Sequence, residues 1–168
     1  MAVRVRELSG VVSAPWRAML NASPVSSAGG GESARFLNPR GAIVDAAVDS
    51  VLGCLAGVTD PEALGNALEP YMKLQALEAQ SDVKATEFLV TLKALFRDAV
   101  EIVGRADMQE AARVIERSLD EMIALAAGMY WKNRRLLVEL RNAEERRIAV
   151  RNLKNENESS QPDGASSR

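Results

Sequence analysis

Residues 107–155 read DMQEAARVIERSLDEMIALAAGMYWKNRRLLVELRNAEERRIAVRNLKN, and this stretch decides the expected fold. It contains no proline and a single glycine, Gly128, so nothing in it ends a helix. At 1.5 Å per residue, an unbroken helix of this length would extend roughly 70 Å, which is more than a small globule covers. We therefore expect part of the helix to meet a partner outside its own domain.

A series of residues, all apolar except Asn133, recurs along this stretch in alternating steps of four and three. They are Met108, Ala112, Ile115, Leu119, Met122, Ala126, Met129, Asn133, Leu136, Leu140, Ala143 and Val150, with Arg147 interrupting the series. We expect the part through Met122 to belong to the domain core. From Lys132 onward the helix is charged on most faces, which is typical of a solvated helix or a coiled coil. In a coiled coil, Asn133 would occupy a position where a buried amide fixes register.

Helix-start signals divide the rest of the chain into shorter helices. The predicted N-terminal caps are Asn38, Asp60, Ser81 and Asp107. Prolines follow the first two caps, as they do at many first helical positions. Pro70 is expected to break or kink the helix that contains it, and Pro15 to break or start another.

The composition then predicts five segments. They are an N-terminal helix at 1–22, a flexible linker at 23–34, a helical core at 35–130, an extended charged helix at 131–156 and a disordered tail at 157–168. The linker interpretation rests on the serine- and glycine-rich run SPVSSAGGGES. The predicted fold class is all-α, a compact helical bundle from which a long C-terminal helix projects.

The composition also excludes several kinds of chemistry. Histidine is absent, which removes histidine bases, histidine-assisted nucleophiles and histidine metal or haem ligands together. Cys54 is the single cysteine, so cysteine-based metal sites lack ligands and a reducing cytoplasm is the expected location. The net charge of −2 predicts no nucleic-acid partner, and no apolar run approaches a membrane span. We expect no enzyme activity and no bound metal or cofactor.

Three blocks of sequence resemble a known family. RFLNPRG at 35–41 is similar to the Phe-x-Asn-Pro-x-Gly opening of the RsbRD N-terminal domain family, the sensor domain of RsbR-type stressosome co-antagonists. MKLQALEAQSDVKATEFLVTLKALFRDAV at 72–100 resembles the family's Gln, Ser-x-x-x-x-Phe and Leu-Lys pattern, and Trp16 resembles the tryptophan of its first helix. Leu74 departs from the pattern, because an arginine is often expected there.

The resemblance implies a globin-like helical sensor that commonly dimerises and passes a signal through a long helix to a STAS domain. The residues after the long helix contain no STAS domain. We therefore expect a sensor-type fold that works by contact with other proteins. A globin-like pocket without histidine would also lack the usual haem ligand.

Two sets of residues are candidates for function. The predicted partner or homodimer interface consists of Tyr130, Trp131, Asn133, Leu136, Leu137 and Leu140. An apolar pocket could be lined by Trp16, Met72, Phe88, Phe96 and Met122, although ordinary core packing explains the same residues. Basic runs at 132–135 and 141–147 could instead contact phosphates or lipid headgroups. Glutamates interleaved with them weaken the positive electrostatic potential that such contacts need.

The leading functional hypothesis is a non-catalytic regulatory or sensor domain that acts through protein contact. One alternative is an accessory structural subunit docked on a larger redox or respiratory complex, and another is a small-molecule carrier with a preformed pocket. Truncation at Ala127 is expected to remove the partner-binding helix and to leave the core folded.

Overall fold

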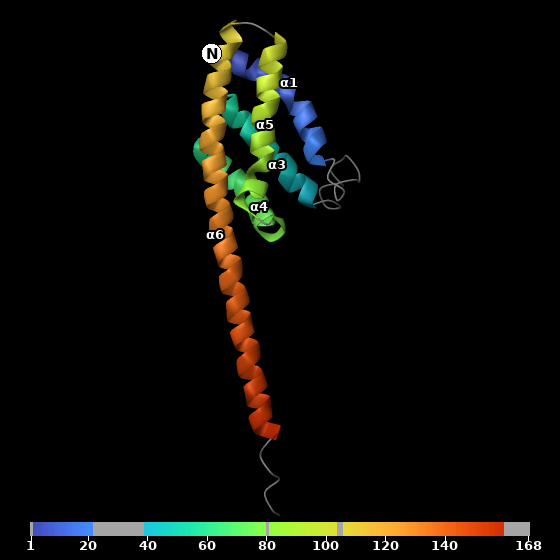
Figure 1. Ribbon diagram of the computed structural model, residues 1–168, viewed down its shortest axis with the longest axis vertical. Helices are drawn as coiled ribbons and strands as arrows, with labels where there is room; N and C mark the ends of the chain where they lie inside the picture. Colours follow the sequence, from blue (N-terminus) through green and yellow to red (C-terminus); the bar gives the residue numbers. More distant parts are fainter. Residues whose placement is uncertain (1, 22–38, 80, 104–105, 160–168) are drawn as a thin grey trace, which may run out of the picture.

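The computed structural model describes residues 2–21, 39–79, 81–103 and 106–159, with side chains over 5–20, 39–79, 81–102 and 108–155. These residues form five helices: α1 (Ala2–Asn21), α3 (Pro39–Leu55), α4 (Pro61–Glu78), α5 (Asp82–Val103) and α6 (Ala106–Ser159). They include no strand, so the predicted all-α class is confirmed. The first half of α6 packs against the other helices, and its second half projects well beyond them (Figure 1). The projecting C-terminal helix is therefore confirmed as well.

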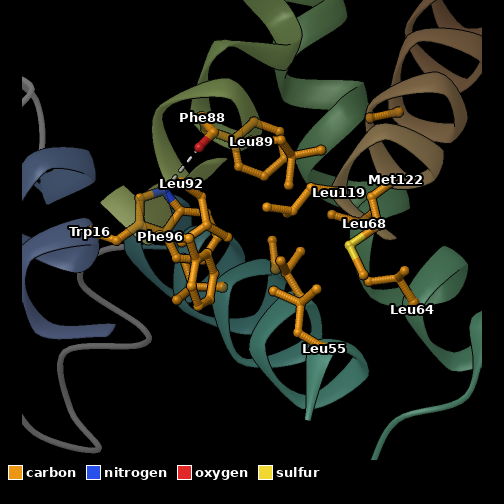
Figure 2. Packing of buried hydrophobic residues seen from close by; sticks show 14 of the residues in the cluster. Trp16, Leu55, Leu64, Leu68, Phe88, Leu89, Leu92, Phe96, Leu119 and Met122 are labelled. Carbon is orange, nitrogen blue, oxygen red and sulfur yellow. Dashed lines mark hydrogen bonds between the residues drawn. The ribbon is translucent and has the colours of Figure 1, made fainter. Parts of the chain in front are cut away.

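A single apolar core draws on all five helices (Figure 2). Its largest fully buried side chains include Trp16 from α1, Leu68 from α4, Phe96 from α5 and Leu119 from α6. Val5, Leu8 and Val12 of α1 are buried in the same cluster. The N-terminal helix, which the sequence separates from the 35–130 core, is thus an integral part of that core.

The buried face of α6 follows an eleven-residue repeat. Its members, in steps of three, four and four, are Met108, Ala111, Ile115, Leu119, Met122, Ala126, Tyr130, Asn133 and Leu137, the last of them partly buried. The predicted four-three series fails in part, because Leu136 is exposed while Ala112 and Met129 are only half-buried. A heptad drifts about 20° per repeat on a straight helix, whereas an eleven-residue repeat of about 3.67 residues per turn stays on one face. A straight helix that packs along a bundle therefore buries residues in an eleven-residue repeat and not in heptads.

Two prolines lie inside helices that the sequence predicts they would interrupt. Pro70 is inside α4 and Pro15 is inside α1. A proline in a helix interior costs about 3 kcal/mol or more. Buried residues stand on both sides of each one, such as Leu68 and Tyr71 around Pro70. The helix continues because ending it would remove one of these anchored turns from the core. The prediction of a break is therefore wrong, and the alternative of a kink at Pro70 stays a prediction.

Two of the predicted caps are confirmed. The Asp60 carboxylate accepts a hydrogen bond from the Ala63 amide at 2.8 Å, with Pro61 as the first residue of α4. The Ser81 hydroxyl accepts one from the Lys84 amide at 3.3 Å, at the start of α5. Each cap satisfies an amide that has no partner within its helix. Asn38, the Asp107 side chain and the linker at 23–34 lie outside the described residues.

Gly57 ends α3 through a left-handed turn. Its φ is +71°, and the Val58 amide donates to the Gly53 carbonyl at 2.8 Å while the Gly57 amide donates to Cys54 at 3.0 Å. This pair of bonds forms a Schellman motif, which requires the left-handed conformation that glycine adopts without penalty.

We predict that Gly57→Ala lowers the free energy of unfolding by about 1 kcal/mol, because a Cβ disfavours the left-handed conformation. Gly65→Ala is the matched control. Gly65 is inside α4, and an added Cβ would lie 3.6 Å from the Met129 methyl, an ordinary contact. It should raise stability by about 0.5–1 kcal/mol through helix propensity. Urea denaturation followed by circular dichroism measures both changes in the free energy of unfolding. Changes of the same sign would contradict the assignment of Gly57 to a left-handed helix end.

Candidate interaction surface on the C-terminal helix

The second half of α6 is not covered by any other part of the chain that the structure describes. Every described side chain in residues 138–155, called here the projecting segment, is exposed. Large apolar side chains occur among them and just before them: Leu136, Val138, Leu140, Ile148, Val150 and Leu153, which are 47–67% exposed. Single exposed apolar residues are common on proteins, but a series along one unsupported helix is typical of an interaction site.

Where α6 leaves the bundle, its side chains hold the junction between α4 and α5. The Tyr130 hydroxyl donates to the Ala79 carbonyl at 3.3 Å, and an Arg134 guanidinium N–H donates to the Ala76 carbonyl at 2.9 Å. Both acceptors are at the C-terminal end of α4, where carbonyls lack helical partners and positive charge is favoured. The Trp131 indole N–H donates to the Asp82 carboxylate at the start of α5, at 3.1 Å. The base of the projecting segment is therefore attached to two other helices.

The predicted interface residues differ in their exposure. Trp131, Leu136 and Leu140 are exposed and available to a partner. Tyr130 and Asn133 are buried in their own chain, and Leu137 is partly buried against the core. The prediction is wrong for Tyr130 and Asn133 because the part of α6 that packs on the core continues past Met122, where the sequence predicts that it ends, as far as Leu137. Asn133 points into its own bundle, so it cannot fix register with another helix.

The expected effect of truncation at Ala127 changes for the same reason. That cut would remove Tyr130 and Asn133 from the core, together with the Arg134 hydrogen bond to α4. It would therefore damage the fold as well as the interface. A chain that ends after Val138 keeps all three residues and removes most of the exposed apolar series.

Charge is distributed unevenly along the chain. Between Lys132 and Lys154 there are eight basic and three acidic residues, a net charge of +5, so the rest of the chain carries −7. Within the segment, Arg141 pairs with Glu145 at 3.1 Å and Arg147 with Glu144 at 3.8 Å. These pairs are exposed and contribute little stability. Residues 132–154, called here the arm, are therefore basic, whereas the rest of the chain is acidic. The overall net charge of −2 hides this asymmetry.

The five residues of the predicted apolar pocket are core residues instead. All are buried within the common cluster, and Trp16 stacks on Phe88 with ring centroids 6.2 Å apart (Figure 2). The Trp16 indole N–H also donates to the Phe88 carbonyl at 2.9 Å. Only Phe88 among the five lines a nearby surface pocket of about 560 Å³ between α1, α3, α4 and α5.

Polar side chains surround that surface pocket. Arg40 pairs with Glu78 at 2.6 Å and Lys84 pairs with Glu87, so both basic groups on its wall already contact carboxylates. Tyr71 lies in the wall and is buried, and this burial raises the pKa of its hydroxyl to about 12. The neighbouring Arg40 charge opposes that shift but does not cancel it. Each charged side chain among the described residues that line the pocket is therefore paired with another.

The raised pKa of Tyr71 predicts that the folded protein loses stability at alkaline pH. Between the ordinary tyrosine pKa of about 10 and the folded pKa of about 12, the unfolded chain loses a proton that the folded chain keeps. Stability from this group is therefore complete below pH 10 and falls by about 2–3 kcal/mol as the pH rises to 12. Tyr71→Phe should remove that part of the pH dependence. The urea midpoints of the unmodified chain and of Tyr71→Phe, measured at pH 9 and 11.5, test this prediction. An equal fall in midpoint for both proteins would contradict it.

None of the described helices contains a segment that is both long enough and apolar enough to span a membrane. Comparison with protein-family models, with curated proteins and with solved structures finds no match to this chain.

Proposed function

We propose that this chain is a non-catalytic regulatory module that acts by binding another protein through the outer face of α6. The observation that carries the proposal is the exposure of Leu136, Leu140 and Val150, the residues that define this outer face, on a part of the helix that no other described part of the chain covers. Aromatic and arginine side chains favour interface hot spots, and Trp131 and Arg135 are both exposed beside Leu136. The single cysteine, Cys54, fits action in a reducing cytoplasm.

A sensor role follows from how the arm is attached. Residues 130–134 contact the end of α4 and the start of α5, so a rearrangement of the bundle would change the direction of the projecting segment. The resemblance to the RsbRD N-terminal domain family supports the same kind of action, in which a helical module passes its state along a long helix. The signal would therefore leave the bundle through α6.

The test is a quantitative pull-down with three baits: the full chain, the chain ending after Val138, and the full chain with Val90→Glu and Ile102→Glu. The third bait is a matched control, because these two exposed apolar residues lie on α5, away from the arm. We expect the same protein to be enriched by the first and third baits and lost from the second. Equal recovery by the truncated chain would contradict the proposal.

The form of the recovered complex separates a regulator from an accessory subunit. Association that is reversible and responds to an effector supports the regulator. A stable stoichiometric complex that resists washing and does not respond to effectors would instead identify the chain as a structural subunit of a larger assembly.

A further inference from the structure

We infer that the partner binds the outer face of α6 with a helix that is apolar in one half of its contact surface and acidic in the other. This inference rests on the proposed function, because it names the chemistry of the partner for the same surface. It is carried by the order in which apolar and basic side chains follow one another along that face.

Six exposed side chains form a single row along the outer face of α6, called here the outer row. Its first half is apolar and its second half is basic, in the order Leu136, Leu140, Ala143, Arg147, Arg151 and Lys154. Each basic residue lies eleven residues after an apolar one, the repeat that stays on one face of a straight helix. At about 100° per residue, all six lie within about 60° of Leu136. The outer row therefore changes from apolar to basic over roughly 27 Å.

The basic half of the outer row has no acidic side chain within it. Residues 146–155 contain four basic and no acidic residues, and the three glutamates of the arm all precede them. Arg147 Nη1 lies 3.8 Å from Glu144 Oε2, but both side chains are exposed, so this pair contributes little. Arg151 and Lys154 form no ion pair with any residue that the structure describes. Positive charge is therefore left for the carboxylates of a partner.

The apolar half of the outer row needs a different kind of contact. Leu136 and Leu140 are 47% and 67% exposed, and burying them is favourable against apolar atoms. The partner must therefore present apolar groups and carboxylates one after the other along a line. A helix meets this requirement, because its own side chains at an eleven-residue repeat share one face and can pack along α6.

Two other anionic surfaces match the outer row less well. The apolar half lies between the bundle and the basic half, so it could enter an anionic bilayer only if the bundle entered with it (Figure 1). A nucleic acid would offer phosphates to the basic half but little apolar surface to Leu136 and Leu140. Residues 132–155 also contain no aromatic side chain on which a base could stack. A helix with an apolar and an acidic half matches both parts of the row.

Binding of designed helical peptides to the full chain tests the inference. Two alanine-rich peptides, stapled on their opposite side to keep them helical, carry three leucines and three glutamates at the spacing of the outer row. One peptide has the leucines first and the other has the glutamates first, so each direction of the partner helix is represented. Fluorescence anisotropy measures the affinity. We expect at least one peptide to bind, and its version with glutamine for glutamate to bind at least about 10-fold more weakly. Failure of both peptides to bind would overturn the inference.

Charge reversal on the chain itself provides the complementary measurement. Arg147→Glu, Arg151→Glu and Lys154→Glu are combined in one protein, called here the outer-row variant. It should bind the peptide at least about 30-fold more weakly, because three attractions become repulsions. Its free energy of unfolding should be nearly unchanged, since all three side chains are exposed.

The matched control makes the same change in charge elsewhere on α6. It combines Arg113→Glu, Arg117→Glu and Arg141→Glu, three exposed arginines that lie at least about 100° around the helix from Leu136. This control should bind the peptide as the unmodified chain does. Equal weakening by the two triple variants would overturn the inference, because overall charge and not the outer row would then control binding.

Other occupants of the outer row give different results in the same assay. Vesicles of phosphatidylcholine and phosphatidylserine, or a DNA duplex, replace the peptide, and sedimentation of the chain alone tests a second copy. Binding or self-association that the outer-row variant abolishes would identify one of these occupants and overturn the inference. In the pull-down, full recovery of the partner by the outer-row variant would also overturn it. Loss of that partner from the chain ending after Val138 would still leave the proposed function standing.

Discussion

Replacing Trp16 by alanine is expected to lower the free energy of unfolding by about 3–5 kcal/mol, a large part of the stability of a domain of this size. The side chain is completely buried and stacks on Phe88. Its loss would leave a cavity between α1 and α5 and would remove a donor from the buried Phe88 carbonyl. Guanidinium denaturation followed by circular dichroism at a helix wavelength measures the change.

Trp131→Ala is the matched control for this prediction. Trp131 is 55% exposed, and its hydrogen bond to Asp82 is at the surface. Its removal should cost less than about 1 kcal/mol. Equal losses for the two tryptophans would show that α1 does not belong to the core, because Trp16 would then contribute no more than a surface residue does.

The second large effect is expected on association and not on folding. Leu136→Glu combined with Leu140→Glu should weaken binding to the partner at least 100-fold, because two buried leucines contribute about 3 kcal/mol or more. Both side chains are exposed within the single chain. The free energy of unfolding, measured at a dilution where the chains are separate, should therefore change by less than about 0.5 kcal/mol.

Val90→Glu combined with Ile102→Glu provides the control for that double variant. It adds the same charge at two exposed apolar positions of α5 and should leave association intact. Sedimentation over a concentration series, or titration with the captured partner, gives the affinities. Equal weakening by both double variants would mean that added negative charge, and not the outer face of α6, controls association.

The sequence predicts those parts of the fold that local chemistry determines. The Asp60 and Ser81 caps depend on a side chain and an amide three residues away, so each can be recognised in a short window. The length of α6 follows similarly from the lack of proline and the single glycine across 107–155. The projection of its second half follows from length alone, because a helix of that size exceeds the bundle.

Features that depend on packing between distant segments could not be predicted in the same way. Pro70 looks like a break in a local window, and only burial on both sides of it keeps α4 continuous. Tyr130 and Leu136 are both apolar, and the choice of which one faces inward depends on how α4 and α5 pack against α6. The Arg134 bond to the Ala76 carbonyl has no signal in the sequence, because 58 residues separate the two.

The central claim is that the outer face of α6 is the surface through which this protein acts, and side-chain footprinting with hydroxyl radicals tests it most directly. The chain is labelled once at high dilution and once in its associated state, whether with a second copy or with the captured partner. Labelling of Leu136, Leu140 and Val150 should fall on association, while that of Val90 and Ile102 stays constant. Protection of the two α5 residues with unchanged labelling along α6 would contradict the claim.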